Sequence, residues 1–89
     1  MSKLKNFMDE NGKLKQWSSK SKNQKPMLEF LAEKFEFGID YTEKEVNEIL
    51  NNFHTFKDSA LLRRELFEQK FLDRTENGSR YWKIKKNAD

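Results

Sequence analysis

The last third of the chain places a helical pattern directly before a hairpin pattern. Residues 59–72 carry apolar side chains at helical spacing, and Leu62 and Leu66 lie one turn apart on a common face. An Asn77-Gly78 pair then separates two β-prone runs. This pair predicts a type I′ turn, because both central residues of that turn need positive φ. A helix followed by a basic hairpin is the second half of a winged helix-turn-helix.

Two further helices and a short strand are predicted upstream. The first helix covers about residues 24–35, with Pro26 in its first turn, where a missing N–H is tolerated. The second begins at Thr42, because Thr42 and Glu45 have the spacing of a capping box. Residues 39–41 are β-prone and predict a brief strand. The expected fold class is therefore α+β, a winged helix-turn-helix of three helices with a C-terminal two-stranded wing.

A short hairpin-like extension is predicted before the helices. Apolar residues flank an Asn11-Gly12 pair within residues 4–17. The polar residues 18–25 are typical of an exposed linker. The chain is thus expected to divide into a basic N-terminal extension, 1–22, a winged-helix domain, 23–86, and a disordered tail, 87–89.

Charge is unevenly distributed along this chain of net charge +3. Residues 1–25 carry seven Lys against two acids, residues 26–56 carry two Lys against seven acids, and residues 57–89 carry nine Lys or Arg against six acids. The two basic ends are suited to a polyanionic partner. No apolar run approaches the ~20 residues of a membrane span, and no signal-peptide block is present, so a cytoplasmic protein with no membrane partner is expected.

Exposed positions of the last helix and of the hairpin suit duplex DNA. In a helix-turn-helix the third helix enters the major groove, and its N-terminal half meets the base edges. Arginine is the side chain best shaped for bidentate contact with guanine or phosphate. The predicted DNA contacts are Lys57, Ser59, Arg63, Arg64, Arg80 and Lys83, with auxiliary phosphate contacts from Lys20, Lys22 and Lys25.

Structural roles compete with this prediction. Arg64 and Glu68 have the i,i+4 spacing of a surface ion pair, and either arginine of the third helix can instead pair with Glu45 or Glu48 of the second. The N-terminal lysines equally suit a solubilising face. His54, the single histidine, is expected to cap the second helix at its C-terminus rather than to bind a metal.

Aromatic side chains support an alternative function. Tyr81 and Trp82 are adjacent on a strand and point to opposite faces, so one packs on the core and the other stays available. The alternative is a winged-helix protein-interaction or effector-sensing module without direct DNA binding, whose contact surface is Trp17, Tyr41 and Trp82. A homodimer or a partner regulator protein is also expected, since a lone small domain buries little surface on DNA.

An enzyme is not expected from this sequence. The chain has three glycines and no phosphate-cradling loop, and its serines lack the context of a nucleophile elbow. It has no cysteine, which excludes thiolate metal sites and disulfides. No catalytic residue, cofactor or metal site is therefore predicted.

Several motifs together have the character of one family. They include Glu45-Val46-Asn47 in the second helix, Leu62-Arg63-Arg64-Glu65-Leu66 in the third and Gly78-Ser79-Arg80-Tyr81-Trp82 at the wing. The pattern resembles prokaryotic domain-of-unknown-function family 2087 over about residues 7–83. Members of that family occur alone or joined to a helix-turn-helix domain in transcriptional regulators. The resemblance therefore implies a bacterial winged-helix-like domain with a role in transcription regulation.

Overall fold

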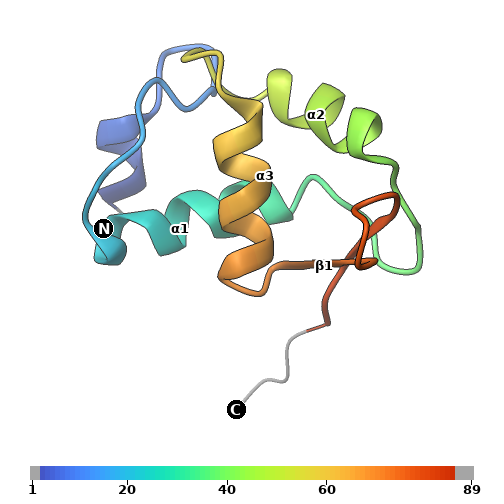
Figure 1. The fold of residues 1–89 in the computed structure, drawn as a ribbon. Coiled ribbons are helices and arrows are strands. Elements are labelled where there is room, and N and C mark those ends of the chain that lie inside the picture. Colours follow the sequence, from blue (N-terminus) through green and yellow to red (C-terminus); the bar gives the residue numbers. More distant parts are fainter. Residues whose placement is uncertain (1–2, 86–89) are drawn as a thin grey trace.

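The computed structural model describes residues 3–85, so the tail predicted at 87–89 lies outside the described residues. A 3₁₀ helix, η1 (Lys3–Phe7), precedes three α-helices, α1 (Ser21–Ala32), α2 (Glu43–Asn51) and α3 (Ser59–Glu68). The strands β1 (Leu72–Arg74) and β2 (Tyr81–Lys83) pair antiparallel and form the wing (Figure 1). The predicted α+β winged-helix layout is confirmed. None of the helices within residues 3–85 is long and apolar enough to cross a membrane.

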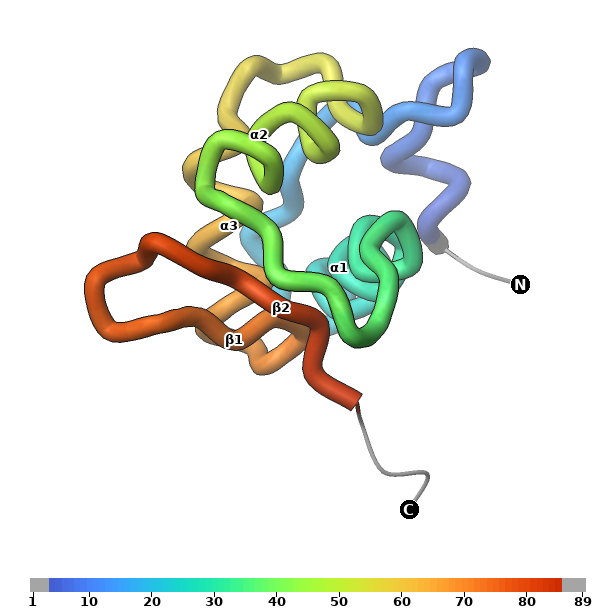
Figure 2. The backbone as a smooth tube through the Cα atoms, turned by 90° about the vertical axis from the view of Figure 1, so that its right-hand side faces the viewer, coloured from blue at the N-terminus to red at the C-terminus, as the bar shows by residue number. Residues whose placement is uncertain are grey.

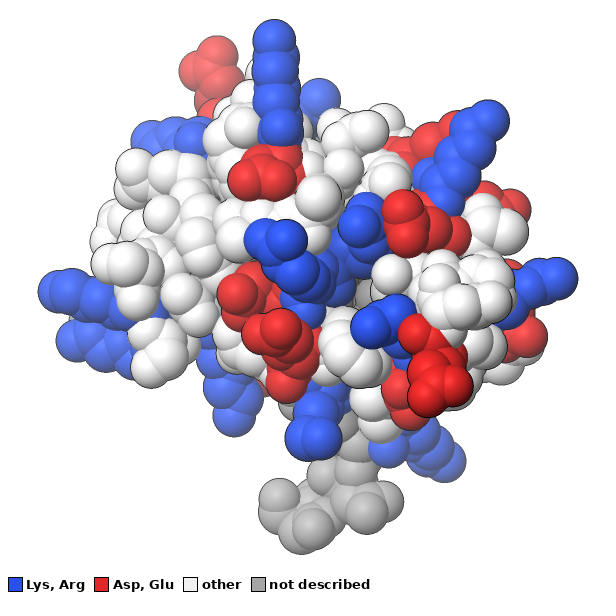
Figure 3. Space-filling model, viewed as in Figure 1, with Lys and Arg blue, Asp and Glu red and all other residues white. Residues whose placement is uncertain are grey.

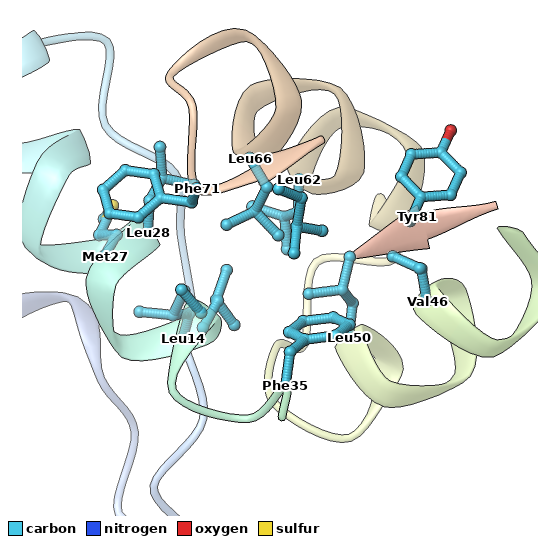
Figure 4. Close-up of a cluster of buried hydrophobic side chains, with 13 residues drawn as sticks. Leu14, Met27, Leu28, Phe35, Val46, Leu50, Leu62, Leu66, Phe71 and Tyr81 are labelled. Carbon is cyan, nitrogen blue, oxygen red and sulfur yellow. The ribbon is translucent and has the colours of Figure 1, made fainter. Parts of the chain in front are cut away.

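The helices and the wing pack around one apolar core. On α3 the inward residues are Leu62 and Leu66, as their spacing predicts, and both are fully buried. On β2 Tyr81 is buried and Trp82 is half-buried, so the two adjacent aromatic residues do lie on different faces. The other core side chains come from α1, α2, β1 and the connecting segments (Figure 4), and they are Leu14, Met27, Leu28, Leu31, Ala32, Phe35, Val46, Leu50, Phe71 and Leu72.

The predicted start of α2 is confirmed by its hydrogen bonds. The Thr42 hydroxyl oxygen accepts from the Glu45 backbone N–H at 3.1 Å, and the Glu45 carboxylate accepts from the Thr42 backbone N–H at 2.9 Å. This reciprocal pair satisfies two donors that the first turn of a helix leaves unpaired. A purely local signal was therefore sufficient to place this helix end.

The bounds of α1 differ from the prediction. The helix begins at Ser21 and ends at Ala32, so residues predicted to be linker form its first turn, and Pro26 is its sixth residue rather than part of that turn. The reason is the segment before it: the Ser18 hydroxyl accepts from the Lys20 N–H at 3.1 Å, and the Lys20 carbonyl accepts from two N–H groups of the first turn. These bonds start the helix without any apolar residue.

Helix α3 ends at Glu68, although the helical spacing in the sequence continues to residue 72. Lys70 adopts φ +68, its N–H donates to the Phe67 carbonyl at 3.1 Å, and the Phe71 N–H donates to the Leu66 carbonyl at 2.8 Å. These two bonds form a Schellman motif, in which the left-handed residue is usually glycine. Because a lysine occupies that position, the sequence lacks the glycine that usually indicates such a helix end.

We expect Lys70→Gly to raise the free energy of unfolding by about 0.5–1 kcal/mol, because glycine adopts positive φ without the Cβ clash. Chemical denaturation with urea measures this change. Lys70→Ala removes the same charge but keeps the Cβ atom, so it should give no gain. Equal stabilisation by both variants would show that the charge, and not the backbone conformation, is responsible.

The wing loop, residues 75–80, does not form the predicted type I′ turn. Gly78 has φ +75, but Asn77 has no positive φ. The Thr75 hydroxyl instead accepts from the N–H groups of Ser79 and Arg80 at 3.0 and 3.2 Å. The Asn77 side-chain oxygen also accepts from the Ser79 N–H at 3.0 Å. These side-chain acceptors stabilise a wider loop in place of the two-residue turn.

The N-terminal extension packs into the core of the helical unit and is not a separate addition to it. Met8 and Leu14 form an antiparallel bridge around Asn11 and Gly12, with η1 in place of a first strand. The Leu14 N–H then donates to the Phe53 carbonyl at 2.8 Å, and its side chain is fully buried. The extension therefore contributes a side chain to the same core as the three helices.

The brief strand predicted at 39–41 is a single bridge. Tyr41 and Tyr81 exchange two backbone hydrogen bonds of 2.7 Å. This bridge fixes the α1–α2 connection against the wing, so the wing is anchored to the helices on this side.

Candidate nucleic-acid interface

One side of the molecule combines α3, the turn before it and the wing loop. Figure 2 shows α3 and the wing loop on the left of the view and the turn before α3 above them, with η1 on the opposite side. We define the α3 face as the exposed Lys57, Ala60, Arg64 and Glu68 and the half-buried Ser59, together with the wing loop.

The N-terminal half of α3 presents small and basic side chains on the α3 face. Ala60, Arg64 and the preceding Lys57 are exposed, and Ser59 is half-buried. Asp58 is the one acid in this stretch, and its carboxylate accepts from the Leu61 N–H at 3.1 Å as the N-cap of α3. The first two turns of the helix therefore offer a cation and little steric bulk to a ligand.

Arg63, unlike the exposed Arg64, is held by side chains of α2. Its Nη1 atom donates to the side-chain oxygen of Asn47, and its Nη2 atom lies 3.8 Å from the carboxylate of Glu43. The Arg63 side chain is only 17% exposed. Pairing with an acid of α2 is the structural role that competed with DNA contact in the sequence, although the acid is Glu43 and not Glu45 or Glu48. Arg63 therefore holds α3 against α2.

The predicted basic residues of the wing lie in different places. Arg80 is exposed on the wing loop. The Lys83 ammonium group instead donates to the Phe35 carbonyl at 3.2 Å and lies 4.5 Å from the centroid of the Phe37 ring. Lys83 is therefore bound to the α1–α2 connection and does not join Arg64 and Arg80.

Arg74 is a basic residue of this region that the sequence did not single out. Its guanidinium lies 4.6 Å from the centroid of the Phe67 ring and donates to the Glu76 carbonyl at 3.3 Å. It lines a depression of about 320 Å³ between α3 and the wing. The contact joins a helix to a strand, so no local pattern in the sequence reports it.

Acidic groups are interspersed with these cations. Glu43 and Glu68 line the same depression, and residues 40–70 hold seven Asp or Glu against five Lys or Arg. Figure 3 shows basic and acidic side chains alternating over the middle of this side. The cations of α3 and the wing thus do not form one uninterrupted positive stripe.

The auxiliary lysines lie at the beginning of α1. Lys20, Lys22 and Lys25 are exposed, and basic side chains gather without acids at the corresponding left edge of Figure 3. The start of α1 is joined to the end of α3 by a 3.1 Å hydrogen bond between the side chains of Gln69 and Gln24. These lysines therefore flank the C-terminal end of α3.

The three aromatic residues of the alternative surface are at most partly exposed. The Tyr41 hydroxyl accepts from the Glu36 N–H at 2.9 Å, and its ring contacts the Phe35 ring edge to face at 5.2 Å. Trp17 and Trp82 are half-buried, and Trp17 packs against the core. Tyr41 is thus engaged in internal packing.

His54 lies at the C-terminus of α2, as predicted, and is 5% exposed. Its Nδ1 atom is 2.8 Å from the Leu50 carbonyl oxygen, and its Nε2 atom accepts from the Asp58 N–H at 3.0 Å. Because a backbone N–H can only donate, Nε2 carries no hydrogen, and Nδ1–H donates to Leu50. The ring therefore joins the end of α2 to the N-cap of α3. No group of three or more potential metal ligands lies together within residues 3–85.

Comparison with known proteins places the chain in a family. No curated protein and no solved structure matches it. A family model described as an uncharacterized protein conserved in bacteria (DUF2087) matches residues 13–83. The matched span begins just before the buried Leu14 and ends with β2, so it includes the whole apolar core. The chain therefore belongs to this uncharacterized bacterial family.

Proposed function

We propose that this chain binds duplex DNA through the α3 face and acts in transcription regulation, which would place it in the bacterial cytoplasm. The observation that carries the proposal is the N-terminal half of α3, where Arg64 is exposed beside the small Ser59 and Ala60 and follows the exposed Lys57. In a helix-turn-helix this half of the third helix meets the base edges. Small side chains there allow the helix backbone to approach the groove closely.

The basic residues of the α3 face and the neighbouring Arg63 then have distinct roles. Arg64 can reach a guanine edge or a phosphate, and Lys57 can neutralise a phosphate beside the helix start. Arg80 lies on the wing loop, at the position from which a wing contacts the neighbouring backbone. Arg63 is a positioning residue, because its bonds to Asn47 and Glu43 fix the orientation of α3.

The acids of the same side set the expected strength of binding. Glu43 and Glu68 repel phosphates near the depression between α3 and the wing, so binding depends on the few free cations. With three phosphates neutralised, the logarithm of the affinity should fall with the logarithm of the salt concentration with a slope of roughly −3. We therefore expect weak binding that is measurable at low salt.

The test is a titration of mixed-sequence duplex DNA at several salt concentrations. We expect Arg64→Ala combined with Arg80→Ala to weaken binding about tenfold or more and to make the salt slope less steep by about 2. The matched control is Lys5→Ala combined with Lys15→Ala, which removes two exposed charges from the N-terminal extension. Equal losses in the two double variants would contradict the assignment of the α3 face.

A second candidate is a winged-helix interaction module that does not touch DNA. The pairing of Arg63 with α2 and the alternation of charges on the α3 face favour this candidate. It predicts no salt-dependent binding of the unmodified chain to duplex DNA. The same titration therefore separates the two functions before any variant is made.

A further inference from the structure

The loop between α1 and α2 exposes two large apolar side chains. Phe37 is 55% exposed and Ile39 is 40% exposed, and they are the exposed large hydrophobic residues of the part of the chain that the structure describes. They flank Gly38, whose φ of +80 turns the loop between them. Because the other large apolar residues described are at least partly buried, this pair requires an explanation of its own.

The loop holds Phe37 and Ile39 in place from both ends. The Glu36 N–H donates to the Tyr41 hydroxyl, and Tyr41 itself is bridged to β2. The Lys83 ammonium group donates to the Phe35 carbonyl and lies over the Phe37 ring. A side chain that is already ordered loses little conformational entropy when a partner binds.

Phe37 also forms one wall of a groove. Ala32 of α1, Phe71 and Ile84 complete the apolar lining of this groove, which has a volume of about 370 Å³. Glu29 of α1, Glu33 at the C-cap of that helix, and Lys83 also line the groove. We call this surface, together with Ile39, the Phe37 groove. Its volume is enough for a few apolar side chains of a partner but is small for a whole ligand.

The charge around the Phe37 groove is acidic. Glu29, Glu33, Glu36 and Asp40 are exposed, and none of the four forms an ion pair with another described residue. Lys83, which also lines the groove, is engaged by the Phe35 carbonyl and the Phe37 ring. The ammonium group of Lys34 lies over the rings of Phe30 and Phe53 instead. An apolar groove with free carboxylates on its rim is complementary to apolar side chains flanked by cations.

We propose that the Phe37 groove docks a cationic amphipathic helix of another protein. The apolar stripe of that helix would cover Phe37 and Ile39, and its Lys or Arg residues would face Glu29 and Glu33. The residues that line the Phe37 groove are not among those of the α3 face, and in Figure 2 the wing loop lies at the left edge whereas the α1–α2 loop lies near the middle. The two surfaces are separate, so this proposal does not depend on DNA binding and both can be occupied together.

A labelled amphipathic Leu/Lys peptide of roughly 14 residues is the probe, and the same peptide with Glu in place of Lys is its control. Fluorescence anisotropy at about 150 mM salt should give a micromolar dissociation constant for the Leu/Lys peptide and no binding of the Leu/Glu peptide. The net charge of +3 would by itself favour the acidic peptide. Tighter binding of the Leu/Lys peptide would therefore show that the local charge of the groove decides which peptide binds. Preference for the Leu/Glu peptide would overturn the proposal.

Variants of exposed residues locate the binding. Phe37→Ser combined with Ile39→Ser should lower the affinity for the Leu/Lys peptide about tenfold or more, while the circular dichroism spectrum of the protein stays unchanged. Glu29→Gln combined with Glu33→Gln should lower this affinity severalfold. The matched pair Glu10→Gln and Glu48→Gln should leave the affinity unchanged. Equal effects of the two glutamate pairs would overturn the proposal.

The alternative occupant of the Phe37 groove is a second copy of this chain. Sedimentation should give the 10.8 kDa monomer for both the unmodified chain and Phe37→Ser with Ile39→Ser. A dimer that is lost in this double variant would assign the Phe37 groove to self-association and overturn the proposal.

Discussion

Truncation of Leu14 to alanine is expected to lower the free energy of unfolding by about 3 kcal/mol, a large part of the stability of a small domain. Leu14 is fully buried in the core although it comes from the N-terminal extension. Its backbone also donates to the Phe53 carbonyl at 2.8 Å and accepts from the Thr55 N–H at 2.9 Å. The truncated side chain would leave a cavity between the extension and the helices that a fixed backbone cannot close.

Leu4→Ala is the matched control, because it removes the same atoms from a half-buried position of the same extension. We expect it to lower the free energy of unfolding by about 1 kcal/mol, because a half-buried leucine removes less apolar surface from water on folding than a fully buried one does. Urea denaturation of the two variants measures both changes. If the two losses were equal, the extension would be a peripheral addition to the fold rather than part of its core.

The sequence predicted those elements whose signals are local. The capping box at Thr42 and Glu45 and the spacing of Leu62 and Leu66 depend on residues three or four positions apart, and both appear in the structure as predicted. The layout of three helices and a wing follows from the order of such signals. Local reading failed at Lys70, because a left-handed helix end was formed by a residue that usually avoids it.

The role of the extension could not be read from local patterns. Leu14 is buried because the turn between α2 and α3 supplies its hydrogen-bond partners, and that turn is about forty residues away in the chain. The imperfect alternation around Asn11 and Gly12 indicates a hairpin but not the surface that it covers. The match to the family begins at residue 13, so it includes Leu14.

The candidate site was predictable only in its residue types. An arginine on the outside of a helix has the same sequence signature whether it faces DNA or an acid of the neighbouring helix. The structure separates the two cases: Arg64 is exposed, whereas Arg63 bonds to Asn47 and lies near Glu43. Lys83 likewise binds a carbonyl that lies far from it in the sequence. Such pairings depend on the packing of α2 on α3 and of the wing on α1.

His54 should have an equally large effect on stability, because it joins α2 to α3. Its ring is buried, lies with its centroid 4.7 Å from that of the Phe56 ring, and accepts a hydrogen bond from the Asp58 N–H through Nε2. His54→Ala would leave a cavity and an unpaired N–H at the start of α3. We expect a loss of about 2–4 kcal/mol in the free energy of unfolding.

Two polar substitutions separate the hydrogen bonds of His54 from its packing. The Leu50 carbonyl also accepts from the Phe53 N–H at 2.9 Å, so it keeps a partner when the imidazole is removed. The side-chain oxygen of glutamine can replace Nε2 as acceptor for Asp58, whereas asparagine is too short and replaces only the donor to Leu50. Thermal and urea unfolding should therefore rank His54→Gln as more stable than His54→Asn. Equal stability of these two variants would show that His54 acts by packing alone. The predicted order would instead show that its acceptor nitrogen holds the N-cap of α3, and so the orientation of the helix that carries Arg64.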